Sequence, residues 1–283
     1  MIELPDPDSM ETVADWVELT LSIGDDQISK AEISSAIEGL AGKEPGEAFI
    51  ASIWRELARR QNLYTWPYFK VEDYIIEAQF SSEPLTQYVA CLLLSLYGVQ
   101  GSTQVPGKLF ERLVRLAMTN YLSGNAVIFG WPFEDVEAEK DKEPAITRKI
   151  KKLAYDLGER FYEAPDARYK DRGVDVIGWI PFKDRRSGQV IVLLQCAAGH
   201  NWEDKLPVPI EAWRQYIHWA SNPIPAFAVP CVVNERQWHD MSKDKGILFD
   251  RVRILNLLPS DLPEKPLSDE LRTWVDKQIK DMS

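Results

Sequence analysis

Residues 173–206, GVDVIGWIPFKDRRSGQVIVLLQCAAGHNWEDKL, decide the fold of this chain. Read as an extended strand, residues 174–180 place Asp175, Ile177 and Trp179 on one side and Val174, Val176 and Ile180 on the other. A charged segment that ends in a Ser-Gly pair follows, and its composition is typical of a hairpin connection. The return segment, 189–197, is apolar on both faces, as expected of a strand near the middle of a covered sheet. The stretch therefore predicts a hairpin whose second strand is central.

Two polar side chains in this hairpin are candidates for chemistry. Asp175 stands among apolar neighbours, and Gln195 ends the apolar return run. Ending such a strand in a polar residue is costly unless the group is used. Both residues fall at the ends of the strands away from the turn, so we expect them to approach each other. The chain then breaks at a glycine, and Asn201, a good N-cap, predicts a short helix.

An Asp on one strand, a hairpin, and a second strand that ends in an acidic or amide residue resemble the PD-(D/E)xK, or restriction-endonuclease-like, nuclease superfamily. The resemblance implies an α/β fold with a mixed central sheet flanked by helices, over roughly residues 107–258. It also implies that Asp175 and Gln195 bind Mg²⁺ or Mn²⁺, since a hard cation accepts carboxylate and amide oxygens. The alternative stays open that Asp175 is a polar edge residue and that Gln195 caps the next helix.

The superfamily pattern also has a Lys two positions after the acidic residue, which orients the attacking water and offsets charge on the phosphate. In this chain that position is Ala197, which can do neither. The resemblance therefore implies a cation from elsewhere in the chain. We expect it from Lys205, with His200 and Lys170 as the alternatives.

A helix is predicted over 108–122, with its apolar residues on one side. In the superfamily the first helix packs on the sheet and often carries a Glu that joins the metal site, frequently after Phe. Glu111 follows Phe110 and matches that position. The alternative is that Glu111 only pairs with Arg115 one turn later.

Composition limits how such a nuclease could work. The chain has 283 residues, 45% of them hydrophobic, and a formal net charge of −11. An acidic surface opposes phosphate capture, so DNA binding requires a local basic patch or a partner subunit. The basic helix predicted over 146–157 is the densest positive patch.

The three cysteines form no CxxC pair, which argues against a zinc site and a disulfide scaffold. No secretory signal or membrane-spanning run is visible, so we expect a cytoplasmic protein that does not bind membranes.

The sequence predicts two parts. Residues 1–100 have helical periodicity and predict an all-α N-terminal module, in which Arg55, Arg59 and Arg60 are expected on a solvated helix face. Glycines frame the segment 101–107, which is the predicted boundary. The restriction-endonuclease-like α/β domain is expected over 107–283.

Three functional hypotheses follow. The resemblance favours a Mg²⁺-dependent DNA endonuclease that acts as the effector subunit of a bacterial defence complex, with a helicase or ATPase as partner. The second hypothesis is a catalytically inactive nuclease-like subunit that serves as a binding or scaffold component, because the motif Lys is missing at Ala197. The third is an unrelated α/β protein in which Asp175 and Gln195 are structural.

Overall fold

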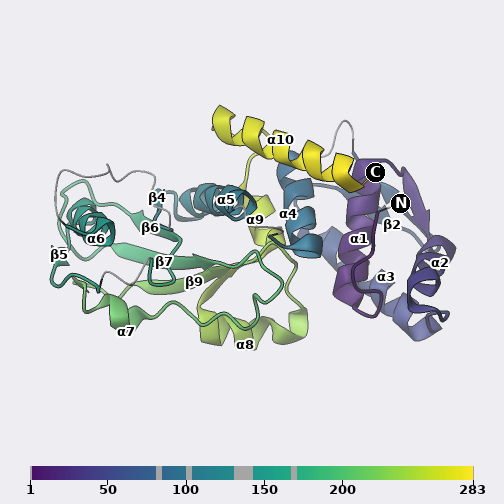
Figure 1. Ribbon diagram of the computed structural model, residues 1–283, viewed down its shortest axis with the longest axis horizontal. Coiled ribbons are helices and arrows are strands. Elements are labelled where there is room, and N and C mark those ends of the chain that lie inside the picture. The colour runs from purple at the N-terminus through teal and green to yellow at the C-terminus, as the bar shows by residue number, and fades with distance from the viewer. Residues whose placement is uncertain (1, 81–84, 100–103, 131–142, 167–170, 283) are drawn as a thin grey trace.

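The computed structural model describes residues 2–80, 85–99, 104–130, 143–166 and 171–282. It is a mixed α/β structure (Figure 1). Its main sheet has five strands in the order β4-β6-β7-β9-β10. Their bounds are β4 Asn125–Ile128, β6 Val176–Ile180, β7 Val190–Cys196, β9 Ile224–Ala228 and β10 Ile247–Phe249.

The hairpin predicted from the sequence is confirmed as β6 and β7. These strands are antiparallel, with Val176 opposite Leu194, and β7 is the middle strand of the sheet. On one side β4 pairs antiparallel with β6, whereas on the other β9 and β10 continue the sheet in parallel. The apolar run of β7 is therefore covered on both faces, as its sequence indicates.

Helices cover both faces of this sheet. Helix α5 (Val105–Leu122) lies on one face, where Val176 and Leu194 point, and on the other face lie α6 (Ala145–Asp156) and α7 (Ile210–Trp213). Helix α8 (Glu235–Lys245) lies on the opposite side of the sheet from α5 (Figure 1). The approach of α5 is close, because a Cβ at Gly178 would stand 2.3 Å from the sulfur of Met118. This contact fixes α5 over β6.

The N-terminal part contains four helices among its described residues: α1 Met10–Ile23, α2 Lys30–Ala41, α3 Glu47–Leu63 and α4 Thr86–Tyr97. The expectation of an all-α module is wrong, because three short strands form an antiparallel sheet in the order β1-β3-β2. They are β1 Gln27–Ser29, β2 Phe69–Val71 and β3 Ile75–Ala78. Strands of three or four residues are too short to show a period of two in the sequence.

The two parts of the chain share one hydrophobic core. Helix α10 (Lys265–Met282) runs along the top of the view and packs on both α4 and α5 (Figure 1). A single cluster of buried side chains extends from Leu4 through α5 to Val275. The boundary predicted at 101–107 lies partly outside the described residues, and α5 begins at Val105.

Two segments after β7 differ from the local pattern. The helix expected from Asn201 is a turn, and the next helix is the four-residue α7. The strand after α7, β8 (Ile217–His218), pairs with β5 (Arg160–Phe161) in a separate two-stranded sheet. Helix α9 (Arg251–Leu257) follows β10. No helix within the described ranges has the length and apolar character needed to cross a bilayer.

Candidate active site

Asp175 lies at the end of the main sheet away from the hairpin turn, where three strands meet. Its backbone N–H donates to the Leu194 carbonyl at 2.9 Å, and its own carbonyl accepts from the N–H groups of Phe129 and Gly130 at 2.7 and 3.0 Å. The carboxylate Oδ2 accepts from the backbone N–H of Cys196 at 2.8 Å. The backbones of β4, β6 and β7 therefore fix both the main chain and the carboxylate of this residue.

Glu111 comes to the same place from helix α5. A Cβ built on Gly130 would stand 2.9 Å from Asp175 Oδ1 and 2.9 Å from Glu111 Oε2, so the two carboxylates converge on one point beside that glycine. Glu111 is buried, and its Oε2 accepts from Lys108 Nζ at 2.9 Å. The alternative pairing of Glu111 with Arg115 is wrong, because Arg115 pairs with Glu264 on the segment before α10.

Gln195 lies next to Asp175 across the hairpin. Extending the register of β6 and β7 by one residue sets the two opposite each other, and such neighbours share a face of the sheet. The Gln195 side-chain amide nitrogen lies near Gly173, at 3.5 Å from the position of a Cβ there. Its carbonyl oxygen is buried and accepts no hydrogen bond from the described residues. An unpartnered buried carbonyl is costly and leaves this oxygen available as a ligand.

The two carboxyl groups hold their protons more tightly than usual. Burial raises the pKa of Asp175 to about 6, and the charge of Asp171 adds to this. Burial also raises the pKa of Glu111 to about 7, and the charge of Asp175 raises it further. Because Asp175 ionises first, its charge opposes the ionisation of Glu111, and the two titrate as a coupled pair.

Two lysines lie within electrostatic reach of this pair. Lys108 pairs directly with Glu111 and, together with Lys205, lowers the pKa of Asp175 against the effect of burial. Lys205 is in the exposed turn after β7, where its backbone carbonyl accepts a hydrogen bond from the buried Lys245. His200 is not among the largest influences on the pKa of either carboxyl group, and Lys170 lies outside the described residues.

The structure also explains why the motif position holds alanine. Ala197 is 2% exposed and packs in a small apolar cluster with Phe227, Val229 and Leu248. A lysine in that cluster would bury its ammonium among apolar side chains, which is unfavourable without a partner.

The donor set fits a hard cation only in part. Within the described ranges, no three or more His, Cys, Asp and Glu side chains are arranged to hold a metal ion. The converging oxygens are those of Asp175 and Glu111, and Gln195 adds an amide that such a count leaves out. Two carboxylates and one amide suit Mg²⁺, which keeps several waters and uses few protein ligands.

Some nearby groups are not suited to chemistry. Burial and the charges of Asp175 and Glu111 raise the pKa of the Cys196 thiol well above its usual range, so a thiolate nucleophile is disfavoured.

The basic helix α6 is not an open positive patch. Lys149 is buried, Lys151 pairs with Glu143 at 2.5 Å, and Lys152 pairs with Asp156 at 2.6 Å.

The residue that the sequence analysis missed is Lys108. It lies three positions before Glu111 on α5, a spacing that places two side chains on one helix face. That spacing was the signal that could have identified it. Asp171, four residues before Asp175, also affects the site, because its charge raises the pKa of both carboxyl groups.

Comparison with the models of known protein families, with characterised proteins and with solved structures gave no match. The geometry of Glu111, Asp175 and Gln195 at one end of a mixed five-stranded sheet is therefore the basis for any functional conclusion.

Proposed function

We propose that this protein is a metal-dependent nuclease of the PD-(D/E)xK kind, which hydrolyses DNA phosphodiesters. One observation supports this most strongly: two buried carboxylates with raised pKa values converge beside Gly130, next to a buried amide oxygen without a partner. Groups with perturbed pKa values gather at functional sites more often than elsewhere.

The order of elements supports the same proposal. A helix that carries Glu111 is followed by the Asp175 strand and then by the strand that ends near Gln195, as in the superfamily's core. The helix expected after that strand is reduced to the four residues of α7, which is a departure. The superfamily resemblance leaves residues 1–100 without an assigned role.

In this mechanism Asp175, Glu111 and the Gln195 carbonyl hold Mg²⁺ or Mn²⁺. An ion held by these residues would supply a bound water of lowered pKa and positive charge to offset the charge that grows on the phosphate. Lys108 holds Glu111 in place by their ion pair and favours its ionised form. Lys205 extends from an exposed turn and contacts the phosphate oxygens. Lys245 positions Lys205 through the hydrogen bond to its carbonyl.

The first experiment measures Mg²⁺-dependent cleavage of plasmid and linear DNA, alone and with candidate partner subunits. Asp175→Asn keeps the shape of the side chain and removes its charge, so we expect it to abolish cleavage. Asp240→Asn, on the exposed side of α8, is the matched control and should cleave like the wild type. We expect Lys205→Met to lower the cleavage rate about 100-fold, the usual effect of removing one group that stabilises transition-state charge. Cleavage that survives Asp175→Asn would contradict the proposal.

The second candidate is a catalytically inactive subunit that binds a metal and serves as a scaffold. Alanine at the motif position favours it. Paramagnetic Mn²⁺ binding, measured by the loss of its free electron-spin resonance signal, separates the two. Binding that depends on Asp175, with no cleavage under any partner or nucleotide condition, would identify the scaffold.

The net charge of −11 bears on the biological setting. Because Lys149 is buried and Lys151 and Lys152 are paired with acids, helix α6 offers little positive charge to attract DNA. We therefore propose that the protein works inside an assembly, as the effector of a bacterial defence complex to which a helicase or ATPase delivers DNA. The dependence of cleavage on the partner and on ATP tests this step.

A further inference from the structure

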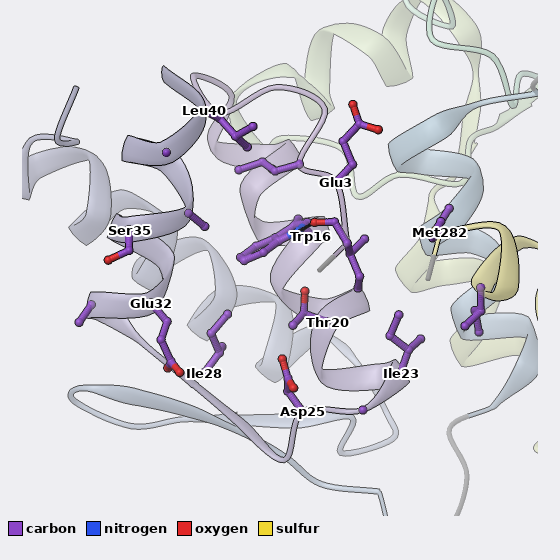
Figure 2. A pocket seen from close by; sticks show the side chains of 17 residues that line it. Glu3, Trp16, Thr20, Ile23, Asp25, Ile28, Glu32, Ser35, Leu40 and Met282 are labelled. Carbon is purple, nitrogen blue, oxygen red and sulfur yellow. Dashed lines mark hydrogen bonds between the residues drawn. The ribbon is translucent and has the colours of Figure 1, made fainter. Parts of the chain in front are cut away.

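A large apolar groove lies far from the candidate active site, between α1 and α2 and beside the end of α10. It encloses about 970 Å³, and Trp16, Thr20 and Ile28 are among the residues that line it (Figure 2). Leu40 and Met282 stand at opposite sides of it in Figure 2. A volume of this size is large enough for several side chains of a partner.

One wall of the groove favours the approach of a helix. Ala31, Ser35 and Gly39 line it at a spacing of four residues along α2, so a row of small side chains runs along that helix beside Glu32 and Leu40. A Cβ at Gly39 would meet nothing within 4 Å. Small residues at this spacing allow another backbone to come close, and a helix can then insert apolar side chains at helical spacing.

The floor and the rim carry two further signals. Thr20 is 8% exposed, and its hydroxyl makes no hydrogen bond within the described part of the chain. The charged residues of the lining are Glu3, Asp25 and Glu32, all acidic, and no Lys or Arg lines the groove among the described residues. Leu40 at the rim is 56% exposed. An apolar floor with an acidic rim fits a partner that is apolar on one face and basic at its margins.

We propose that the groove between α1 and α2 binds a basic amphipathic helix of a partner protein. Its apolar side chains cover Trp16 and Ile28, a polar group satisfies the Thr20 hydroxyl, and its Lys or Arg side chains face Asp25 and Glu3. This binding is independent of the nuclease chemistry, because the groove shares no residue with the site around Asp175.

The test uses a fluorescein-labelled peptide of about 14 residues, roughly 20 Å as a helix, with Leu and Lys at helical spacing. Fluorescence anisotropy with the full-length protein measures its affinity. We expect Gly39→Phe to weaken binding at least tenfold, because the new ring fills the groove. This variant should fold, since Gly39 is in a helix interior where glycine is a poor helix former. Thermal unfolding followed by circular dichroism checks this.

Charge and sequence controls make the test specific. Asp25→Lys on the rim should weaken binding about threefold to tenfold, whereas Glu38→Lys, exposed on α2 but outside the groove, should leave it unchanged. A peptide of the same composition in which Leu and Lys alternate cannot form an apolar helix face, and it should bind at least tenfold more weakly than the test peptide. A helical peptide with Glu in place of Lys should also bind at least tenfold more weakly.

Three results would overturn the proposal. Equal affinity of the wild type and Gly39→Phe would show that the peptide binds elsewhere. A concentration-dependent dimer that sedimentation detects in the wild type but not in Gly39→Phe would assign the groove to a second copy of this chain. Binding of the neutral dye N-phenyl-1-naphthylamine that is lost in Gly39→Phe, without any peptide binding, would assign it to a small apolar molecule.

Discussion

Asp175 and Glu111 are two acids whose burial works against their charge. Because both are removed from water, the pKa of Asp175 is raised to about 6 and that of Glu111 to about 7. A divalent cation between them would replace those protons and remove the repulsion. The pair is thus suited to bind a cation. Without a bound cation, the ionised pair destabilises the folded state.

The first prediction concerns stability without metal. Because both folded pKa values lie above the unfolded ones, the folded state holds more protons between about pH 4 and pH 7, and stability falls as the pH rises through this window. Asp175→Asn removes the charge and can still accept the hydrogen bond from Cys196. We expect the free energy of unfolding of Asp175→Asn, relative to that of the wild type, to rise by about 2–3 kcal/mol between pH 4 and pH 8.

Urea unfolding in EDTA at both pH values measures this gain, and Asp240→Asn on α8 is the exposed control. A wild type and an Asp175→Asn variant with parallel stability profiles would show that Asp175 ionises normally.

The second prediction concerns Lys108. Its ion pair lowers the pKa of Glu111 against the effects of burial and of Asp175. In Lys108→Met we therefore expect the pKa of Glu111 to move above about 7, and Mn²⁺ binding to reach its half-maximum at a higher pH. Binding at pH 9 should not fall, since the lost cation also repelled the metal. Titration with Mn²⁺ from pH 5.5 to pH 9 measures the shift. The exposed hairpin variant Lys183→Met should keep the wild-type midpoint, and an unshifted midpoint in Lys108→Met would contradict the assigned role.

At the scale of elements, a buried ionic cluster holds the helices of the two parts together. Arg60 of α3 and Arg251 at the start of α9 are fully buried, and both contact Asp15 and Glu18 of α1. Burial by itself would raise the pKa of Asp15, but the charges of Arg251 and Arg60 and the hydrogen bonds from Arg251 and Ser95 together lower it to about 2. Tyr64 and Tyr88 donate to Glu18 at 3.0 and 2.7 Å. Arg251 Nη1 makes no hydrogen bond to the described residues, so the cluster is not fully satisfied. A buried ionic cluster of this kind fixes the relative positions of its helices more than it adds to stability.

The third prediction follows from this cluster. Arg251→Leu leaves Asp15 and Glu18 with one buried arginine fewer, and we expect the free energy of unfolding to fall by about 3–5 kcal/mol at pH 7. The loss should be smaller at pH 3, where protonation becomes possible for carboxylates that have lost their partner. Chemical denaturation at both pH values measures it. Arg272→Leu, on the exposed side of α10, is the matched control. A loss below about 1 kcal/mol would mean that water enters and replaces the arginine.

At the scale of the whole molecule, the continuous core predicts that the two parts unfold together. Helix α10 packs on both α4 and α5, and Leu271 within it is 1% exposed in the shared cluster. We expect one calorimetric transition whose enthalpy equals the van't Hoff enthalpy. Leu271→Ala should lower its stability by about 2–5 kcal/mol without splitting it. Two transitions, of which only one shifts in Leu271→Ala, would show that the parts are independent domains.

Local periodicity was enough for several features of this protein. The alternation over 174–180 and the apolar run over 189–197 specified the hairpin, and the helical spacing over 108–122 specified α5. The meeting of Asp175 and Gln195 also followed, because a hairpin register depends only on the turn and the strands beside it. These features are set by residues close together in the chain.

Other features were decided only by contacts between distant segments. Arg60 was expected on a solvated face but is fully buried, since its partner Asp15 lies 45 residues away and Arg251 in the same cluster lies 236 residues from Asp15. Asn201 could cap a helix, yet the segment after it forms a turn that Lys245 of α8 holds through Lys205. The sequence alone determined which strand and helix carry the acids. Only the tertiary structure decided which charges surround them, because burial and ion pairing depend on what the rest of the chain packs against each side chain.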